Sequence, residues 1–165
     1  MQLDKIFLKL GLTSSSAELI TLALVLIVIS AIFWLLIGRF RLHNFLINIY
    51  ISFALLAVLP QDMLTFTKSA PALVFLIFIV LLTLMNRYLF DIHQSGSGLA
   101  IWQVFVVSFL EVGLMISIIL SYIPSKEVLK YLSRDASFYF VSPWAKFVWM
   151  VLPIAFLIFV KKREK

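Results

Sequence analysis

Long apolar runs separated by short polar or charged breaks dominate the hydropathy pattern of this chain. The runs occupy residues 17–37, 44–60, 71–86, 99–123 and 143–160. A helix rises about 1.5 Å per residue, so about 20 apolar residues match the roughly 30 Å hydrocarbon thickness of a bilayer. The pattern therefore predicts four transmembrane helices, and a fifth at 143–160 that either spans the membrane or lies partly in its interface.

Two shorter segments, 1–12 and 125–135, have apolar residues at helical spacing with charged residues between them. Such amphipathic helices lie in the plane of the membrane interface. For the first segment, a frayed chain terminus is the alternative. We therefore predict an all-α fold, a polytopic membrane protein with one domain over 1–165, four or five transmembrane helices and short interfacial helices.

Composition supports this class. Hydrophobic residues make up 63% of the 165 residues and charged residues 13%, whereas a soluble domain is about half apolar and a quarter charged. The net charge is +6, but the basic residues lie at the edges of the apolar runs, where they meet anionic lipid headgroups. We therefore expect the lipid bilayer and anionic headgroups as partners, and no nucleic acid. The absence of cysteine excludes disulfides and thiolate metal sites.

The distribution of basic residues predicts an orientation. With five spans, the two termini lie on opposite sides, and lysines and arginines divide equally between the sides. Those at Arg39, Arg41, Arg87 and in the tail 161–165 lie in short loops or directly against helix ends, where the positive-inside rule applies most strongly. We therefore place the C-terminus in the cytoplasm and the N-terminus outside.

Glu111 is the sharpest polar feature, because it lies midway along the apolar run 99–123. A charged carboxyl is costly there, and burial favours its neutral form. Ser108 is its neighbour on the same helix, and Gln103 and Asn48 complete the candidate intramembrane polar site. The functional interpretation is a proton or cation site. The structural interpretation is a protonated acid hydrogen-bonded to Asn48 or to a serine of another helix.

Gly113, Ser117 and Ser121 recur every four residues along the same run. Small residues at this spacing allow another helix to approach closely. The pattern predicts a helix-packing surface, used either within the chain or between copies in an oligomer.

Arg39, Arg41, His43 and Arg87 fall on the predicted cytoplasmic side and form a candidate basic face. Such a face binds phosphate-bearing headgroups or a protein partner. The alternative is that these residues only fix the orientation of the helices.

Nucleophile, phosphate-binding and dinucleotide-binding motifs are absent from the sequence. We therefore predict no enzyme activity, no catalytic residue, no cofactor and no metal site.

The layout resembles the CvpA family, small bacterial inner-membrane proteins named for colicin V production. The likeness rests on the basic turn Gly38-Arg39-Phe40-Arg41, the loop Ser95-Gly96-Ser97-Gly98 before a long span, and the later stretch Ser142-Pro143. Departures from the family pattern are Phe40, where glycine is frequent, and Trp102 and Phe105, where spaced glycines are usual. The run after Pro143 is additional. The resemblance implies a multi-pass inner-membrane protein linked to export or envelope function, with no established catalytic residues.

Two functions are therefore carried forward. The first is a non-enzymatic, CvpA-like membrane component of a bacterial export or envelope-related complex, with other membrane proteins or further copies of itself as partners. The second is a small proton- or cation-coupled transporter or channel subunit that uses Glu111.

Overall fold

The computed structural model describes residues 14–37, 42–60, 67, 69–89, 100–130 and 132–163. Within these residues the chain forms seven helices and no strand, as predicted for an all-α fold. The helices are α2 (Ser14–Ile37), α3 (Leu42–Val58), α4 (Ala70–Leu89), α5 (Ile101–Tyr122), α6 (Ser125–Val128), α7 (Arg134–Val141) and α8 (Pro143–Arg163). The interfacial helix predicted at 1–12 lies outside the described residues.

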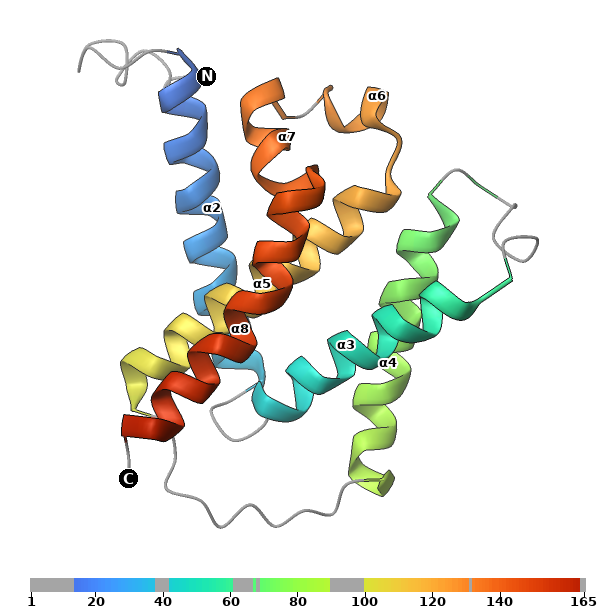
Figure 1. The fold of residues 1–165 in the computed structure, drawn as a ribbon, viewed down its shortest axis with the longest axis vertical. Helices are drawn as coiled ribbons and strands as arrows, with labels where there is room; N and C mark the ends of the chain where they lie inside the picture. The colour runs from blue at the N-terminus through green and yellow to red at the C-terminus, as the bar shows by residue number, and fades with distance from the viewer. Residues whose placement is uncertain are drawn as a thin grey trace.

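The five long helices alternate in direction. Figure 1 shows α2, α4 and α8 running one way and α3 and α5 the other, so the two termini lie at opposite ends of the molecule. α5 is the central helix, because it contacts α2, α3, α4, α7 and α8. A side chain midway along α5 is therefore enclosed by other helices.

Among the described residues, two helices are long and apolar enough to cross a membrane, Ile101–Tyr122 and Pro143–Lys161. Three shorter apolar segments, Leu19–Leu35, Leu42–Val58 and Ala70–Met85, cover the other predicted spans. The five long helices thus match the five apolar runs of the sequence, with ends that differ by a few residues.

The segment between α5 and α8 differs from the single helix predicted at 125–135. It contains the short helix α6 and a separate helix α7 that continues to Val141. The new helix begins because the Ser133 hydroxyl accepts a hydrogen bond from the Ala136 backbone N–H at 3.2 Å, which satisfies a free donor of the first turn. Hydrophobic spacing at 125–135 was consistent with helix, but it did not reveal this interruption.

The core consists of three groups of buried apolar side chains that meet around α5. The largest joins α3, α4 and α5 through Phe45, Leu46, Ile49, Leu56, Phe75, Ile79, Leu114 and Ile118. A second joins Leu26, Val112 and Phe140, and a third joins Leu42, Val104 and Val107. Phe33 packs against all three groups and so links α2 to the rest of the bundle.

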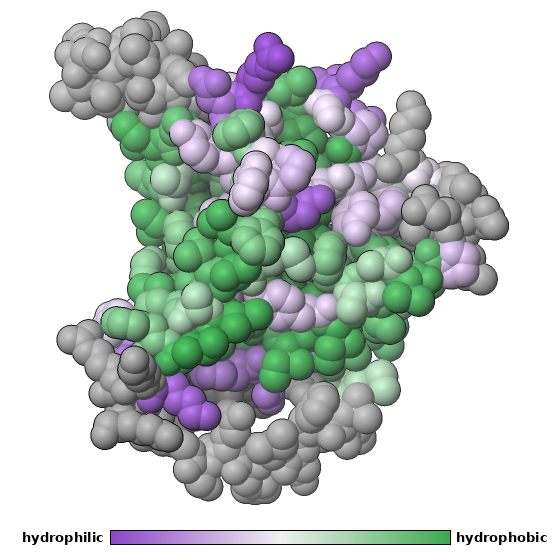
Figure 2. All heavy atoms as spheres, viewed as in Figure 1, coloured by the Kyte–Doolittle hydropathy of each residue, from purple (hydrophilic) through white to green (hydrophobic). Residues whose placement is uncertain are grey.

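The outer surface is also apolar. Figure 2 shows hydrophobic side chains in a broad belt across the middle of this face, with hydrophilic side chains towards both ends. Large exposed apolar side chains lie on α2, α4 and α8, including Leu24, Ile32, Leu35, Leu73, Ile77, Leu84, Val151, Ile158 and Phe159. The bundle therefore has apolar side chains inside and outside at the same level.

Candidate functional site

The Glu111 side chain is fully buried in the middle of α5, with 0% of its surface exposed. Neither carboxyl oxygen has a hydrogen-bond partner among the described residues. The Ser108 hydroxyl, one turn earlier on the same helix face, is also buried and unpartnered there. Buried polar groups are normally hydrogen-bonded, so an unpaired carboxyl is an exception that requires an explanation.

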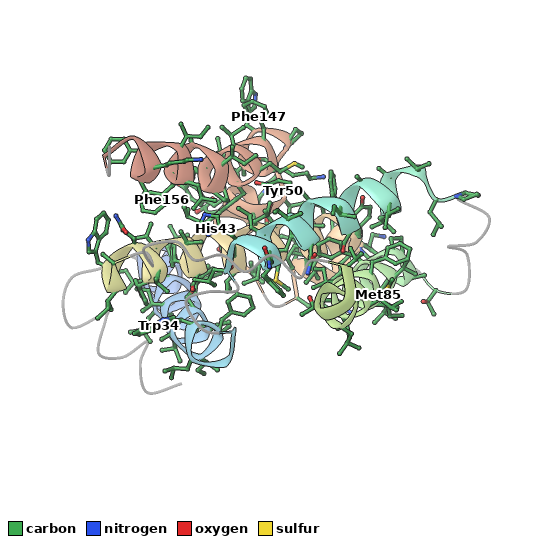
Figure 3. All side chains as sticks on the ribbon, turned by 90° about the horizontal axis from the view of Figure 1, so that it is seen from below. Trp34, His43, Tyr50, Met85, Phe147 and Phe156 are labelled. Carbon is green, nitrogen blue, oxygen red and sulfur yellow. The ribbon has the colours of Figure 1, made fainter. Side chains whose placement is uncertain are left out.

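Tyr50 of α3 joins two helices through its hydroxyl. In this structure, the hydroxyl donates a hydrogen bond to the backbone carbonyl of Met150 on α8, at 2.5 Å. Figure 3 shows Tyr50 lying where α3 and α8 meet. Sequence reasoning missed Tyr50, because one tyrosine in an apolar run has no distinctive spacing.

Pro153 interrupts the backbone hydrogen bonding of α8 next to this bond. Proline has no backbone N–H, and its ring distorts the preceding turn of a helix. Pro153 lies inside α8, so the carbonyl four residues earlier, that of Trp149, receives no N–H from it. Met150 is the next residue along, and its carbonyl accepts the hydrogen bond from the Tyr50 hydroxyl.

The remaining predicted polar residues bond elsewhere. Asn48 is buried, and its amide Nδ2 donates to the Thr83 hydroxyl of α4 at 3.3 Å. It therefore crosslinks α3 to α4 and does not serve as the hydrogen-bond partner of Glu111 that the structural interpretation needed. Gln103 Oε1 accepts from the Ala100 backbone N–H at 2.7 Å and caps the start of α5. Eight residues separate Gln103 from Glu111, about 12 Å along the helix.

Two polar side chains of α3 bond to neighbouring helices. Asn48 and Tyr50 are two residues apart, about 3 Å along the axis of α3. Asn48 bonds to α4 and Tyr50 bonds to α8, whereas the Glu111 carboxyl of α5 has no hydrogen-bond partner among the described residues. Ser52 on α3 adds a further buried hydroxyl without a partner among the described residues.

Two of the three small residues of α5, Gly113 and Ser117, face other helices of the same chain. The indole ring of Trp149 on α8 lies against Gly113. The Ser117 hydroxyl donates to the Phe140 carbonyl of α7 at 2.6 Å, and the Ser121 hydroxyl donates to the Ser117 carbonyl at 2.7 Å. Ser117 and Gly113 thus bring α7 and α8 close to α5, the element that carries Glu111.

The candidate basic face is described only at His43. Arg39 and Arg41, and the side chain of Arg87, lie outside the described residues. His43 is in the first turn of α3, ahead of the apolar run 44–60, and Figure 3 shows it near Phe156 of α8. Burial lowers the pKa of His43, and the positive charge of Lys161 lowers it further. The start of α3 and the end of α8 therefore lie at the same end of the bundle.

No set of three histidine, cysteine, aspartate or glutamate side chains that would hold a metal occurs in the described part of the chain. No family model matches this sequence, and no curated protein or solved structure matches it either. The resemblance to the CvpA family therefore rests on the sequence features alone.

Proposed function

We propose that this chain is a multi-pass membrane protein that crosses a bilayer five times, through α2, α3, α4, α5 and α8. Their lengths of 24, 17, 20, 22 and 21 residues correspond to about 25–36 Å, which brackets the hydrocarbon thickness. Their alternating directions (Figure 1) support placing the N-terminus and C-terminus on opposite sides. The basic residues in short loops and against helix ends favour a cytoplasmic C-terminus, in a bacterial inner membrane.

The exposed apolar surface supports the same proposal. On α4, the side chains of Leu73, Ile77, Val80, Leu81 and Leu84 are each about half exposed or more. They fall on one outward stripe at helical spacing. A large exposed apolar patch is rare on a soluble monomer, whereas lipid chains cover such a stripe without cost.

We propose further that the protein moves protons across this membrane and that Glu111 is the group that binds and releases them. The observation that carries this proposal is the fully buried Glu111 carboxyl, neither oxygen of which has a hydrogen-bond partner among the described residues. A carboxyl kept for stability would be hydrogen-bonded, because an unpaired buried polar group destabilises the fold by about 1–3 kcal/mol. A carboxyl that must take up and release a proton has a different requirement, since tight pairing would fix one protonation state.

The alternative function, a non-enzymatic component of an export or envelope complex, requires a surface for other proteins. The helix-packing residues Gly113 and Ser117 contact α8 and α7 of this chain, so they are not free to bind a partner. No other feature of the described residues favours that function. The buried Glu111 carboxyl, unpaired among the described residues, therefore makes proton transfer the better-supported proposal.

The test is proton flux into liposomes that contain the purified protein and a pH-sensitive dye, driven by a potassium diffusion potential. We expect flux with the wild-type protein and none with Glu111→Gln, which preserves the size of the side chain but cannot ionise. Glu127→Gln is the matched control, because Glu127 is exposed on α6, and it should retain flux. Wild-type flux no greater than that of protein-free liposomes would refute the proposal.

The crossing pattern has a separate test that uses the absence of native cysteine. Single cysteines at Thr67, Ala100 and Ser125, all exposed, can be labelled with a membrane-impermeant maleimide. The five-span proposal expects Thr67→Cys and Ser125→Cys to react from one side of the membrane and Ala100→Cys from the other. Labelling of Thr67→Cys and Ala100→Cys from the same side would contradict it.

A further inference from the structure

Exposed aromatic side chains flank the short break between α7 and α8. Phe138 and Tyr139 on α7, and Trp144 and Phe147 on α8, each have more than half of their surface exposed, and Trp144 has 77%. The rings pair edge to face, with centroids 6.2 Å apart for Phe138 and Tyr139 and 6.5 Å apart for Trp144 and Phe147. Figure 3 shows Phe147 pointing away from the bundle. We call these four side chains the junction aromatics.

The inner side of the same junction is fixed to the bundle. Phe140 is buried in a group with Leu26 of α2, and its carbonyl accepts the hydrogen bond from Ser117. The Tyr139 carbonyl accepts the hydrogen bond from Trp149 Nε1 at 3.1 Å. The eight residues of α7 extend for only about 12 Å, too short to cross a bilayer. The junction aromatics are therefore held on the outside by a segment whose own core contacts are already made.

Basic residues surround the junction in the sequence. Residues 122–148 contain four basic and two acidic residues, a net charge of +2. Lys126 and Lys130 are exposed before α7, Arg134 is exposed at its start, and Lys146 lies in the first turn of α8. Figure 1 shows α7 at the end of the bundle away from the C-terminus, and Figure 2 shows hydrophilic side chains beyond the apolar belt at that end.

We propose that the junction aromatics and these basic residues form a docking surface for the headgroup layer of the bilayer, where the phosphates of anionic lipids bind. This inference rests on the proposed membrane crossing and not on the proposed proton transfer. Tryptophan and tyrosine concentrate at the membrane–water interface, because their rings are apolar but carry a polar group. Lysine and arginine near the membrane surface attract anionic lipids.

Lipid fits this surface better than a protein partner does. The exposed apolar surface of α8 continues from the junction through Val148, Val151 and Leu152, which lipid chains cover in the five-span arrangement. The headgroups of the same lipids then lie beside the junction aromatics. Three of the four basic residues are lysines, and lysine is depleted in protein–protein interfaces.

The first experiment measures the depth of the junction in the bilayer, using spin labels on single cysteines in the full chain. Oxygen, which concentrates in hydrocarbon, and a water-soluble nickel complex report the depth of each label. We expect Val151→Cys to lie in the hydrocarbon, Ser125→Cys in water, and Trp144→Cys between them. A Trp144→Cys label in water, or as deep as Val151→Cys, would overturn the inference. A Val151→Cys label in water would instead refute the membrane crossing itself.

The second experiment tests the charge of the lipid. A fluorophore on Val148→Cys, exposed beside the junction, reports quenching by brominated phosphatidylglycerol or brominated phosphatidylcholine at equal mole fraction. We expect stronger quenching by the anionic lipid. Lys146→Gln should lower this preference by about fivefold. Lys161→Gln is the matched control, because Lys161 is exposed at the other end of α8, and it should leave the preference unchanged.

Equal quenching by the two lipids would overturn the inference, because the surface would then not select anionic headgroups. Weak quenching by both would also overturn it, and would indicate that a second copy of the chain covers the junction. Equal losses in Lys146→Gln and Lys161→Gln would show that overall charge, and not this surface, sets the preference.

Discussion

The indole ring of Trp149 lies so close to Gly113 that a Cβ atom at position 113 would be 2.1 Å from its Cζ3 atom. No side chain larger than hydrogen fits at that distance. Trp149 is also fixed from its other sides, since its Nε1 donates to the Tyr139 carbonyl at 3.1 Å and its ring stacks on Phe140 with centroids 5.6 Å apart. The contact sets how closely α8 approaches the helix that carries Glu111.

Gly113→Ala should therefore destabilise the protein by about 1–3 kcal/mol, measured as the free energy of unfolding in detergent. The sign is diagnostic, because alanine in a helix is otherwise about 1 kcal/mol more favourable than glycine. Trp149→Phe removes the ring atoms that clash, so adding Gly113→Ala to Trp149→Phe should cause little further loss. Additive effects of the two substitutions would contradict the contact.

Removing the Glu111 carboxyl should stabilise the fold while abolishing proton flux. Glu111→Met fills a similar space without an unpaired polar group, so we expect a gain of about 1–3 kcal/mol in the free energy of unfolding. Glu127→Met on the surface should change it by less than about 0.5 kcal/mol. A less stable Glu111→Met protein would show that the carboxyl has a structural hydrogen bond.

Ser117→Ala should weaken the attachment of α7 to α5. The substitution removes the buried 2.6 Å bond to the Phe140 carbonyl, which contributes about 1 kcal/mol to stability. Ser137→Ala is the control, because the Ser137 hydroxyl bonds to the Arg134 carbonyl in an exposed position, and its loss should be much smaller. Thermal unfolding of the two variants side by side measures the difference, and equal losses would contradict the importance of burial.

The stability of the bundle should fall on mild acidification because of His43. Burial and Lys161 lower its pKa from the ordinary value of 6.5, so the folded state favours the neutral imidazole. This stability is fully present above pH 6.5, where both states are neutral, and is lost as the pH falls below 6.5 and the unfolded state binds the proton first. His43→Asn should flatten the dependence of unfolding temperature on pH in this range. An unchanged slope would show that other groups cause it.

Much of the architecture is encoded locally in the sequence. The apolar runs determine five long helices. Apolar side chains offer the backbone no hydrogen-bond partners, so the backbone N–H and C=O groups bond to one another within a helix. Pro124 ends α5 as its position implies, with Ile123 in an extended conformation. The depth of Glu111 within its run also follows from the sequence, since it lies near the middle of α5.

The tertiary structure decided which groups meet. Asn48 and Gln103 had been grouped with Glu111 by polarity and depth, but Asn48 bonds to Thr83 and Gln103 caps its own helix. Tyr50, Met150 and Trp149 acquired their roles only when α3, α5 and α8 packed together. Helical periodicity specifies which face a residue occupies, whereas the partner on that face depends on helix rotation and crossing, which contacts distant in the sequence determine. For that reason the sequence by itself determined the helices and the depth of the acid, and only the packed bundle determined that the acid is sealed from solvent with no partner among the described residues.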